Sequence, residues 1–443
     1  MPAVHAAASP AAELPSGPRP RASIILYVMD TVRADRLGVY GYPLATSPRL
    51  DRLARRGLVF DAAYSPGPST TWSVPAFLTS RHPIEMAGTI GPQPAEHTLA
   101  EALSAAGYAT ACLQGNYGLI PELGFGRGFD LYRVLRKGTE GAYRYWTARE
   151  VNDEALAWIS ALPPDRPFFF YTQVMDAHFP YDPPPRYRGS LHDADSAAAQ
   201  DRREVLRQFA ATGLSEAQLE VYGKDLDAMS PDRYDEALAW LTDEFVRLVG
   251  GLKRLGRFDN TFIVLTADHG EPLGEHGAMV HGMNLHEEQV HVPLVVWGPG
   301  VRTGRNGDLV GLVDLAPTLL ALVGVPVPAS FRGESLLGAR SMPPTAVGEM
   351  GPGPFNMPAS QFVRRGQWKL IAYADRMRLF DLAADPKETR DVAAEHPAVV
   401  TELATELARR MPPLGAPAAS VSTLPAPVKK DLEKSLRSLG YVE

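Results

Sequence analysis

The stretch "TFIVLTADHGEPLGEHGAMVHG", residues 261–282, decides the fold of this chain. It begins as an apolar run and then places three histidines and three carboxylates between Asp268 and His281. A short run that is apolar throughout is typical of a strand buried on both faces, as in a parallel sheet covered by helices. Ligands of such sheets bind beyond the carboxyl ends of the strands, where these ionisable groups fall. A metal site and a solvated loop both explain the cluster. The residues that follow the other predicted strands distinguish the two interpretations.

Further apolar segments and helical patterns alternate along the chain. The predicted strands include "SIILYVM" (23–29), "PFFFYTQVM" (167–175) and "VPLVVWG" (292–298). Helical patterns lie between them, among them "SPRLDRLARRG" (47–57), which has a proline at the first helical position. Strands alternating with helices predict the fold class: α/β, with a mostly parallel central sheet flanked by helices.

Changes in sequence character suggest the domain organisation. Residues 1–21 are rich in Ala, Pro and Ser and predict a disordered leader. The α/β domain is expected over 22–342, with a charged insertion at about 184–230. From about residue 343 polar and apolar residues alternate, as in "SQFVRRGQWKLIAYADRMRLFDL", so 343–443 predict a small C-terminal antiparallel α+β subdomain and tail.

Composition limits the partners and the compartment. The formal net charge is −7 without long basic blocks, which argues against nucleic acid and favours a small polar substrate. The single cysteine, Cys112, cannot form a disulfide within the chain. The leader lacks the apolar core of a signal peptide, and no run reaches the about 18 apolar residues of a transmembrane helix. We therefore expect no membrane segment and a cytoplasmic location for the chain as given, or a periplasmic one if an N-terminal portion is missing.

Polar residues follow three of the predicted strands directly. They are Asp30 and Thr31 after the first strand, Asp176 and His178 after "FFFYTQV", and Asp268 and His269 after "FIVLTA". Because carboxyl ends of parallel strands meet at one edge of a sheet, we expect these residues to form a functional cluster.

Seven segments, in order, are similar to motifs of the sulfatase family within the alkaline phosphatase superfamily. They are "YVMDTVRADRLGVYG" with its continuation to "DAAYS", "VMDAHFPYDPP", "LTADHGEPLGEHG", "VPLVVWGPG", "VDLAPTLLALVGVP", "WKLI…LFDLAADPKETRDVA" and "LRSLGYVE". The resemblance runs from about residue 22 to the C-terminus. It implies an alkaline phosphatase-like α/β sandwich with a small C-terminal subdomain, and metal-assisted hydrolysis or transfer of a sulfate or phosphate ester.

Attack on such an ester needs a nucleophile, a cation and a proton donor for the leaving oxygen. Asp30, Asp268 and His269 are the metal ligands that we expect, with simple capping of the strand ends as the alternative. Carboxylate oxygens combined with imidazole suit a divalent metal, Mn, Zn or Ca, and one ion is expected.

The nucleophile position departs from the resemblance. Formylglycine sulfatases carry Cys or Ser in a C/S-x-P-x-R pattern, whereas this chain has "PGPSTTWSVPAFLTSRHP". Alignment on "FLTS" places the nucleophile at Thr70, and alignment on "SVPAF" places it at Ser73, with neither register restoring the arginine. Both registers indicate an unmodified hydroxyl nucleophile, which a helix N-terminus and a metal would activate. Thr71 as nucleophile, and helix capping by these hydroxyls, remain alternatives.

Other positions match the resemblance residue by residue. His178 matches a histidine for the substrate or leaving group and is a general-acid candidate, with a capped turn as the alternative. His281 replaces a lysine that often contacts the transferred group, and Asn116 falls near the position of the bound anion. Thr31 stands where many relatives have a second aspartate.

Five further polar residues have other candidate roles. Asp176, His276 and His286 are candidates for a second metal, with loop histidines as the alternative. Arg33 and Asp35 are better interpreted as a structural ion pair.

The sequence therefore predicts a metal-dependent hydrolase of sulfate or phosphate esters with a hydroxyl nucleophile, acting on a small anionic ester. A phosphodiesterase or phosphonate hydrolase and a phosphoalcohol transferase are the enzymatic alternatives. A degenerate relative that binds an anionic ester without turning it over is the alternative from another class.

Overall fold

The computed structural model describes most of the chain. The described residues are 13–86, 91–93, 95–137, 144–192, 229–338, 343–351 and 358–414. Most of the expected insertion and the closing "LRSLGYVE" lie outside them. Among the described residues, no helix combines the length and the apolar character needed to cross a membrane.

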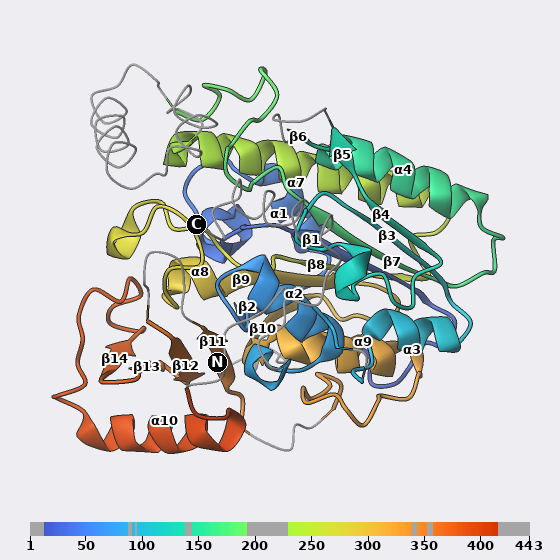
Figure 1. Cartoon of the computed structure of the whole chain (residues 1–443). Coiled ribbons are helices and arrows are strands. Elements are labelled where there is room, and N and C mark those ends of the chain that lie inside the picture. The colour runs from blue at the N-terminus through green and yellow to red at the C-terminus, as the bar shows by residue number, and fades with distance from the viewer. Residues whose placement is uncertain are drawn as a thin grey trace, which may run out of the picture.

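A mixed eight-stranded sheet, with strand order β10-β2-β9-β8-β1-β7-β3-β4, forms the centre of the molecule (Figure 1). Its strands are β1 (Ser23–Met29), β2 (Leu58–Tyr64), β3 (Ala109–Gln114), β4 (Leu131–Val134), β7 (Phe168–Val174), β8 (Thr261–Thr266), β9 (His291–Trp297) and β10 (Gly304–Gly311). Only β9 runs antiparallel to its neighbours; every other pairing in this sheet is parallel. The central strands β1, β7 and β8 are buried along their whole length, as their continuous apolar runs predict.

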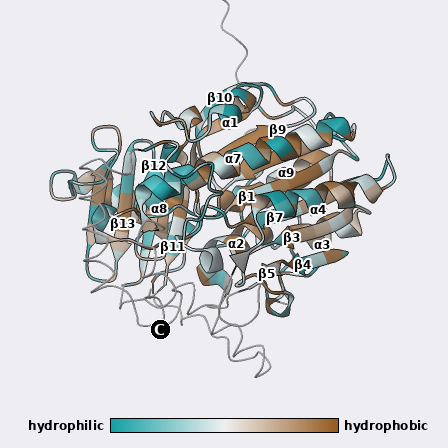
Figure 2. Ribbon diagram, turned by 90° about the horizontal axis from the view of Figure 1, so that it is seen from above, coloured by the Kyte–Doolittle hydropathy of each residue, from teal (hydrophilic) through white to brown (hydrophobic). Residues whose placement is uncertain are grey.

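Helices cover both faces of this sheet (Figure 1). One layer consists of α1 (Pro48–Ala54), α4 (Ala148–Ala161) and α7 (Pro231–Arg254), and the other of α2 (Thr70–Thr79), α3 (Leu99–Ala105) and α9 (Leu315–Val323). Figure 2 shows the hydrophobic colour concentrated on the sheet strands, with hydrophilic stretches on the outer helices. Capping boxes at Thr98 and Thr147 fix the starts of α3 and α4 by satisfying backbone N–H groups.

A separate antiparallel sheet follows in the C-terminal part. It consists of β11 (Ala346–Met350), β12 (Ser360–Arg365), β13 (Trp368–Tyr373) and β14 (Met377–Asp381). One face carries α10 (Pro397–Arg410) through Leu403 and Leu407. The other face packs Phe362 and Ile371 against Tyr64 of the large sheet and Leu285. The short α8 (Glu287–Val290) leads into β9 beside this interface. The predicted fold class is therefore confirmed, including the small C-terminal antiparallel sheet.

The leader prediction needs one correction. Residues 1–12 lie outside the described residues, but residues 13–21 contact the α/β domain at particular points while most of them stay exposed. Leu14 is buried, and backbone hydrogen bonds join Arg19 N–H to the carbonyl of Leu322 and Arg302 N–H to that of Glu13. The Pro-rich composition concealed this extended packing because such a segment has no periodicity to mark its buried side chains.

Buried charges join the two sheets. The Lys369 ammonium on β13, with no side-chain exposure, lies 2.9 Å from Glu287 Oε1 and 3.0 Å from Glu388 Oε1. His286 Nδ1 lies 3.1 Å from Glu388 Oε2. Burial alone would raise the pKa of Glu388, but Lys369 and His286 hold it well below its usual range. Lys369 is therefore a buried cation shared by the buried Glu388 and by the half-buried Glu287, which also lies 3.5 Å from Arg364.

We expect Lys369→Met to lower the free energy of unfolding by about 3–5 kcal/mol, because it leaves buried charge without its partner. Urea unfolding followed by tryptophan fluorescence measures this. Because the pKa of Glu388 is lowered, its stabilising contribution is complete above the unfolded value of 4.5 and is lost as the pH falls below it. The difference between variant and wild type should therefore narrow in acid.

Arg376→Met is the matched control, since Arg376 pairs with the exposed Asp375 on the same sheet. It should change the unfolding free energy by less than about 1 kcal/mol. Equal losses in the two variants would contradict the role given to Lys369.

Candidate active site

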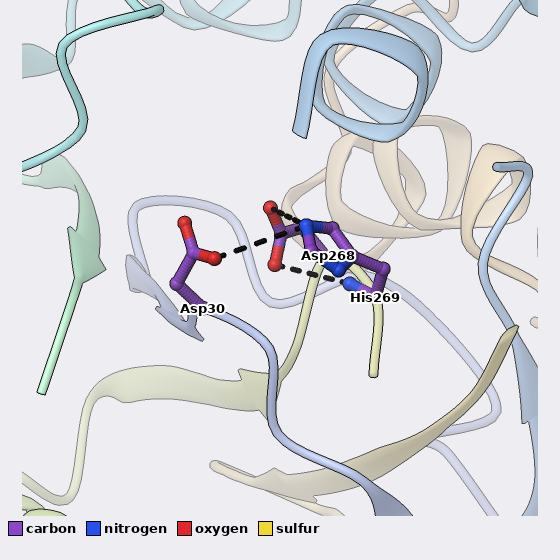
Figure 3. Close-up of side chains that lie close together, drawn as sticks. All are labelled: Asp30, Asp268 and His269. Carbon is purple, nitrogen blue, oxygen red and sulfur yellow. Dashed lines mark hydrogen bonds and ion pairs between the residues drawn. The ribbon is translucent and has the colours of Figure 1, made fainter. Parts of the chain in front are cut away.

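The candidate site lies at the carboxyl ends of β1 and β8 and at the N-terminus of α2. The parallel register pairs Val28 with Thr266, so the residues after the two strands emerge side by side. Asp30 follows β1, Asp268 and His269 follow β8, and all three are fully buried. Figure 3 shows their side chains pointing toward one another. The strand-end arrangement expected from the sequence is present for these three residues.

Asp30, Asp268 and His269 form the candidate metal site of the described residues. One ligand atom from each lies within 4.8 Å of the others. His269 Nε2 lies 3.5 Å from Asp268 Oδ2 and 3.8 Å from Asp30 Oδ1 (Figure 3). His269 Nδ1–H donates to the Gly270 carbonyl at 2.9 Å, which leaves Nε2 as the atom facing the carboxylates. Asp30 Oδ1 is buried and makes no hydrogen bond among the described residues, so a cation fits this donor set.

The Thr70 hydroxyl lies against all three of these residues. It is the first residue of α2, with Ser69 at the N-cap position. Its Oγ1 donates to Asp268 Oδ2 at 2.8 Å and lies 3.4 Å from both Asp30 Oδ2 and His269 Nε2. The helix N-terminus and the candidate metal site therefore converge on this hydroxyl.

The other hydroxyls of this segment are placed differently. Ser73 Oγ donates to the backbone carbonyl of Asp268 at 2.6 Å, one helical turn beyond Thr70. Thr71 Oγ1 lies 3.3 Å from Ser69 Oγ. Ser73 therefore ties α2 to the end of β8.

Two amides complete the surroundings of the carboxylates. Asn116 Nδ2 lies 3.0 Å from Asp30 Oδ2 and 3.2 Å from Thr70 Oγ1, next to the position expected for an anion. Gln173, on β7, lies with Nε2 2.5 Å from Asp30 Oδ2 and 2.8 Å from Asp268 Oδ2. Sequence reasoning missed Gln173, although a polar residue in the otherwise apolar "FFFYTQV" was a signal.

Three imidazoles lie in a row outward from the candidate metal site, in tilted and edge-to-face contact. The ring centroids of His269 and His281 lie 4.5 Å apart, and those of His281 and His178 lie 4.9 Å apart. His178 Nδ1–H donates to the Phe179 carbonyl at 2.7 Å. His281 bonds through Nδ1 and through its backbone N–H to Glu271 Oε1, each at 3.0 Å. Glu271 was not among the site residues expected from the sequence, although it lies in the segment 261–282 that contains Asp268, His269 and His281.

Burial dominates the electrostatics of this site. It raises the pKa of Asp268 to about 6 and that of Glu271 to about 7. It also lowers the pKa of His269 to about 3, as it does that of His281, where His178 adds to the effect. The leading charged influences on the pKa values of Glu271, His269 and His281 are other histidines and carboxylates, whereas hydrogen bonds from Thr70 and backbone N–H groups act on Asp268. The described site therefore combines carboxylates with neutral imidazoles.

Thr31 adopts a strained backbone in this site. Its φ is 62°, which is uncommon for a β-branched residue and costs about 1–3 kcal/mol. Its hydroxyl lies 2.6 Å from the Ala177 carbonyl, and Tyr234 donates its hydroxyl to the Thr31 carbonyl at 2.8 Å. The strained turn places the Thr31 N–H 3.4 Å from Asp268 Oδ1. Thr31 thus supplies a backbone donor in place of a carboxylate ligand.

The residues considered for a second metal do not join the described site. Asp176 accepts hydrogen bonds from Trp240 Nε1 at 2.6 Å and from Ala148 N–H at 2.8 Å. His276 and His286 stack with ring centroids 3.7 Å apart at the interface with the C-terminal sheet. The structural ion pair of Arg33 with Asp35 is confirmed, at 2.8 Å.

Comparison with known proteins gives consistent matches. The family model described as "Sulfatase" matches residues 22–325. Arylsulfatase K of Bos taurus is 35% identical over 178 residues, which cover 36% of this chain and 32% of that protein. The arylsulfatase of Clostridium perfringens is 24% identical over 439 residues, covering 83% of this chain and 89% of that one.

A solved structure extends the likeness in fold. The phosphonate monoester hydrolase of Agrobacterium radiobacter superposes with a TM-score of 0.68 at 20% identity, covering 88% of this chain and 95% of that one. The matched segment spans only about a third of the bovine arylsulfatase K.

We expect Mn²⁺ or Zn²⁺ to raise the thermal midpoint of metal-stripped protein, since a ligand at 100 times its Kd adds about 2.7 kcal/mol of stability. Asp268→Asn should remove most of that shift by removing a charged ligand. Asp176→Asn is the matched control, because Asp176 is a half-buried aspartate near a strand end that is held by Trp240. An unchanged shift in Asp268→Asn would contradict the metal assignment. Differential scanning fluorimetry with and without metal measures all three proteins.

Proposed function

We propose that this chain, which belongs to the sulfatase family, is a metal-dependent hydrolase of monoanionic sulfate or phosphate-type esters and uses Thr70 as its nucleophile. The observation that carries the proposal is the position of Thr70 Oγ1, within 3.4 Å of Asp30, Asp268 and His269. A hydroxyl held against three candidate metal ligands at a helix start is placed for activation.

The proposed ion is held by Asp30, Asp268 and His269, and Mn or Zn suits this mixture of oxygen and imidazole nitrogen. A divalent cation bound there would lower the pKa of the adjacent hydroxyl and stabilise charge on the oxygens of the transferred group. The further contribution of the chain is to hold Thr70, to orient the ester and to move protons.

The proposed chemistry has two displacement steps. Thr70 Oγ1 passes its proton to Asp268 Oδ2 and forms a bond to the sulfur or phosphorus atom while the bond to the leaving oxygen breaks. A protonated His178, with His281 beside it, gives its proton to the leaving oxygen. Water then breaks the Thr70 ester, which restores the hydroxyl and releases the anion. Asn116 Nδ2, 3.2 Å from Thr70 Oγ1, is placed to donate to an oxygen of the transferred group.

The charge of the site favours monoanionic substrates. The ionised Asp30 and Asp268 balance one divalent cation, His269 and His281 with their lowered pKa values add no positive charge at neutral pH, and Glu271 can add only negative charge. Sulfate monoesters, phosphodiesters and phosphonate monoesters carry one negative charge, whereas phosphate monoesters carry two near neutral pH. The side chains that donate to the two aspartates are neutral, so a second charge on the substrate would be poorly compensated.

Phosphodiester or phosphonate cleavage is the second candidate, favoured by the unmodified hydroxyl at the nucleophile position. The fold likeness to a phosphonate monoester hydrolase is compatible with either chemistry. A phosphoalcohol transferase would pass the group from Thr70 to an alcohol in place of water. A non-catalytic protein would bind the ester and leave it intact.

The deciding experiment compares Thr70→Ala with Ser73→Ala on nitrophenyl sulfate, phosphate, phosphodiester and phosphonate esters, with saturating Mn²⁺ or Zn²⁺. We expect wild type to turn over a monoanionic ester and to prefer it to the phosphate monoester. Thr70→Ala should lose at least about 10³-fold in kcat/KM, because it removes the proposed nucleophile. Ser73→Ala should keep most of the turnover and lose about 1–3 kcal/mol of stability, since its hydroxyl ties α2 to the Asp268 carbonyl.

The reverse ranking of the two variants would assign the nucleophile to Ser73. If the wild-type protein binds the metal and the esters but hydrolyses none of the esters, the chain is a non-catalytic binding protein.

A further inference from the structure

We infer that Gln173 is a positioning residue for the metal site: its side-chain amide holds Asp30 and Asp268 in the orientation that binds the ion. The inference rests on the proposed function, because it concerns the same metal site. Gln173 is fully buried on β7, the strand beside β1, and is paired with Val28. β7 and β8 lie on opposite sides of β1, so Gln173 reaches the two carboxylates from the side of β1 away from β8.

The amide has one N–H group for each carboxylate. Nε2 lies 2.5 Å from Asp30 Oδ2 and 2.8 Å from Asp268 Oδ2, both within hydrogen-bonding distance. An amide nitrogen carries two N–H donors, so both bonds form at once. Gln173 thus ties the end of β1 to the end of β8 through their acidic residues.

The orientation of the amide is set by Tyr171. The Tyr171 hydroxyl donates to Gln173 Oε1 at 2.8 Å. An ionised carboxylate only accepts hydrogen bonds, so the carboxylate side of the amide must be its nitrogen. Tyr171 is itself held edge-on against Phe77 of α2, with ring centroids 6.4 Å apart. Tyr171 therefore contacts both α2, the helix that begins at Thr70, and the Gln173 amide that binds the two carboxylates.

The donors around Asp30 select which oxygen remains for the ion. Gln173 and Asn116 both donate to Oδ2, whereas Oδ1 makes no hydrogen bond among the described residues. A neutral amide suits this position for an electrostatic reason. It lowers the repulsion between two buried carboxylates without adding a cation that would compete with the metal.

Titration calorimetry on the full chain, stripped of metal and titrated with Mn²⁺ and with Zn²⁺, tests the inference. We expect Gln173→Leu to weaken metal binding by about 10–100-fold, the range found when partners of metal ligands are removed. Tyr171→Phe should weaken it by a smaller factor in the same direction, because the amide stays but loses its orienting donor. Circular dichroism checks that each variant is folded.

Gln361→Leu is the matched control. Gln361 is a buried glutamine of the C-terminal sheet whose Nε2 donates to the Pro412 carbonyl at 2.9 Å. It should leave the metal Kd unchanged, whatever its effect on thermal stability. A second measurement separates positioning from substrate contact: turnover of Gln173→Leu should recover toward the wild-type value at saturating metal.

The inference is overturned if Gln173→Leu folds and binds metal as tightly as wild type, or if turnover stays low with metal saturating. Should Gln173→Leu fail to fold, an unchanged metal Kd in Tyr171→Phe overturns it in the same way. Wild type that binds neither Mn²⁺ nor Zn²⁺ would instead refute the proposed function. The two failures are therefore distinguishable in one series of titrations.

Discussion

The convergence of two buried carboxylates at the ends of β1 and β8 is the constraint on which the site depends. Taking each ion out of water costs several kcal/mol, so Asp30 and Asp268 require compensation from their surroundings. The chain supplies it with neutral donors: the Thr70 hydroxyl, the amides of Asn116 and Gln173, and the strained Thr31 N–H. These donors come from four different segments, so the site is complete only when the whole sheet and α2 have assembled.

The sequence predicted the part of this arrangement that the sheet determines. Strands that are apolar throughout indicated a parallel sheet, and acidic residues directly after them had to meet at one edge. This reasoning located Asp30, Asp268 and His269. It did not choose between Thr70 and Ser73 because the two differ by one helical turn, and only the packing of α2 decides which hydroxyl faces the carboxylates. In the structure Ser73 reaches the backbone carbonyl of Asp268, just after β8.

Residues whose partners are distant in the sequence were not predictable in this way. Glu271 is ten residues from His281, and a single motif contains both, yet only the folded loop places the carboxylate on Nδ1. His276 and His286 were interpreted as a possible second metal site, but the structure packs them against the C-terminal sheet near Glu388. That contact crosses about a hundred residues of sequence, and no local pattern encodes it.

The neutrality of the described donors to the carboxylates has a functional consequence. A lysine or arginine beside Asp30 would neutralise it in the absence of metal and would stay there when the ion arrived. Neutral donors leave the negative charge of Asp30 and Asp268 uncompensated. A bound divalent ion would therefore be the dominant positive charge of the site, and the electric field at Thr70 would depend on it. His178 would then stabilise a leaving group by proton transfer, while binding of the anion would fall to the metal and to Asn116. On this argument metal affinity and the preference for monoanionic esters have one origin, the balance of two carboxylates against one divalent cation.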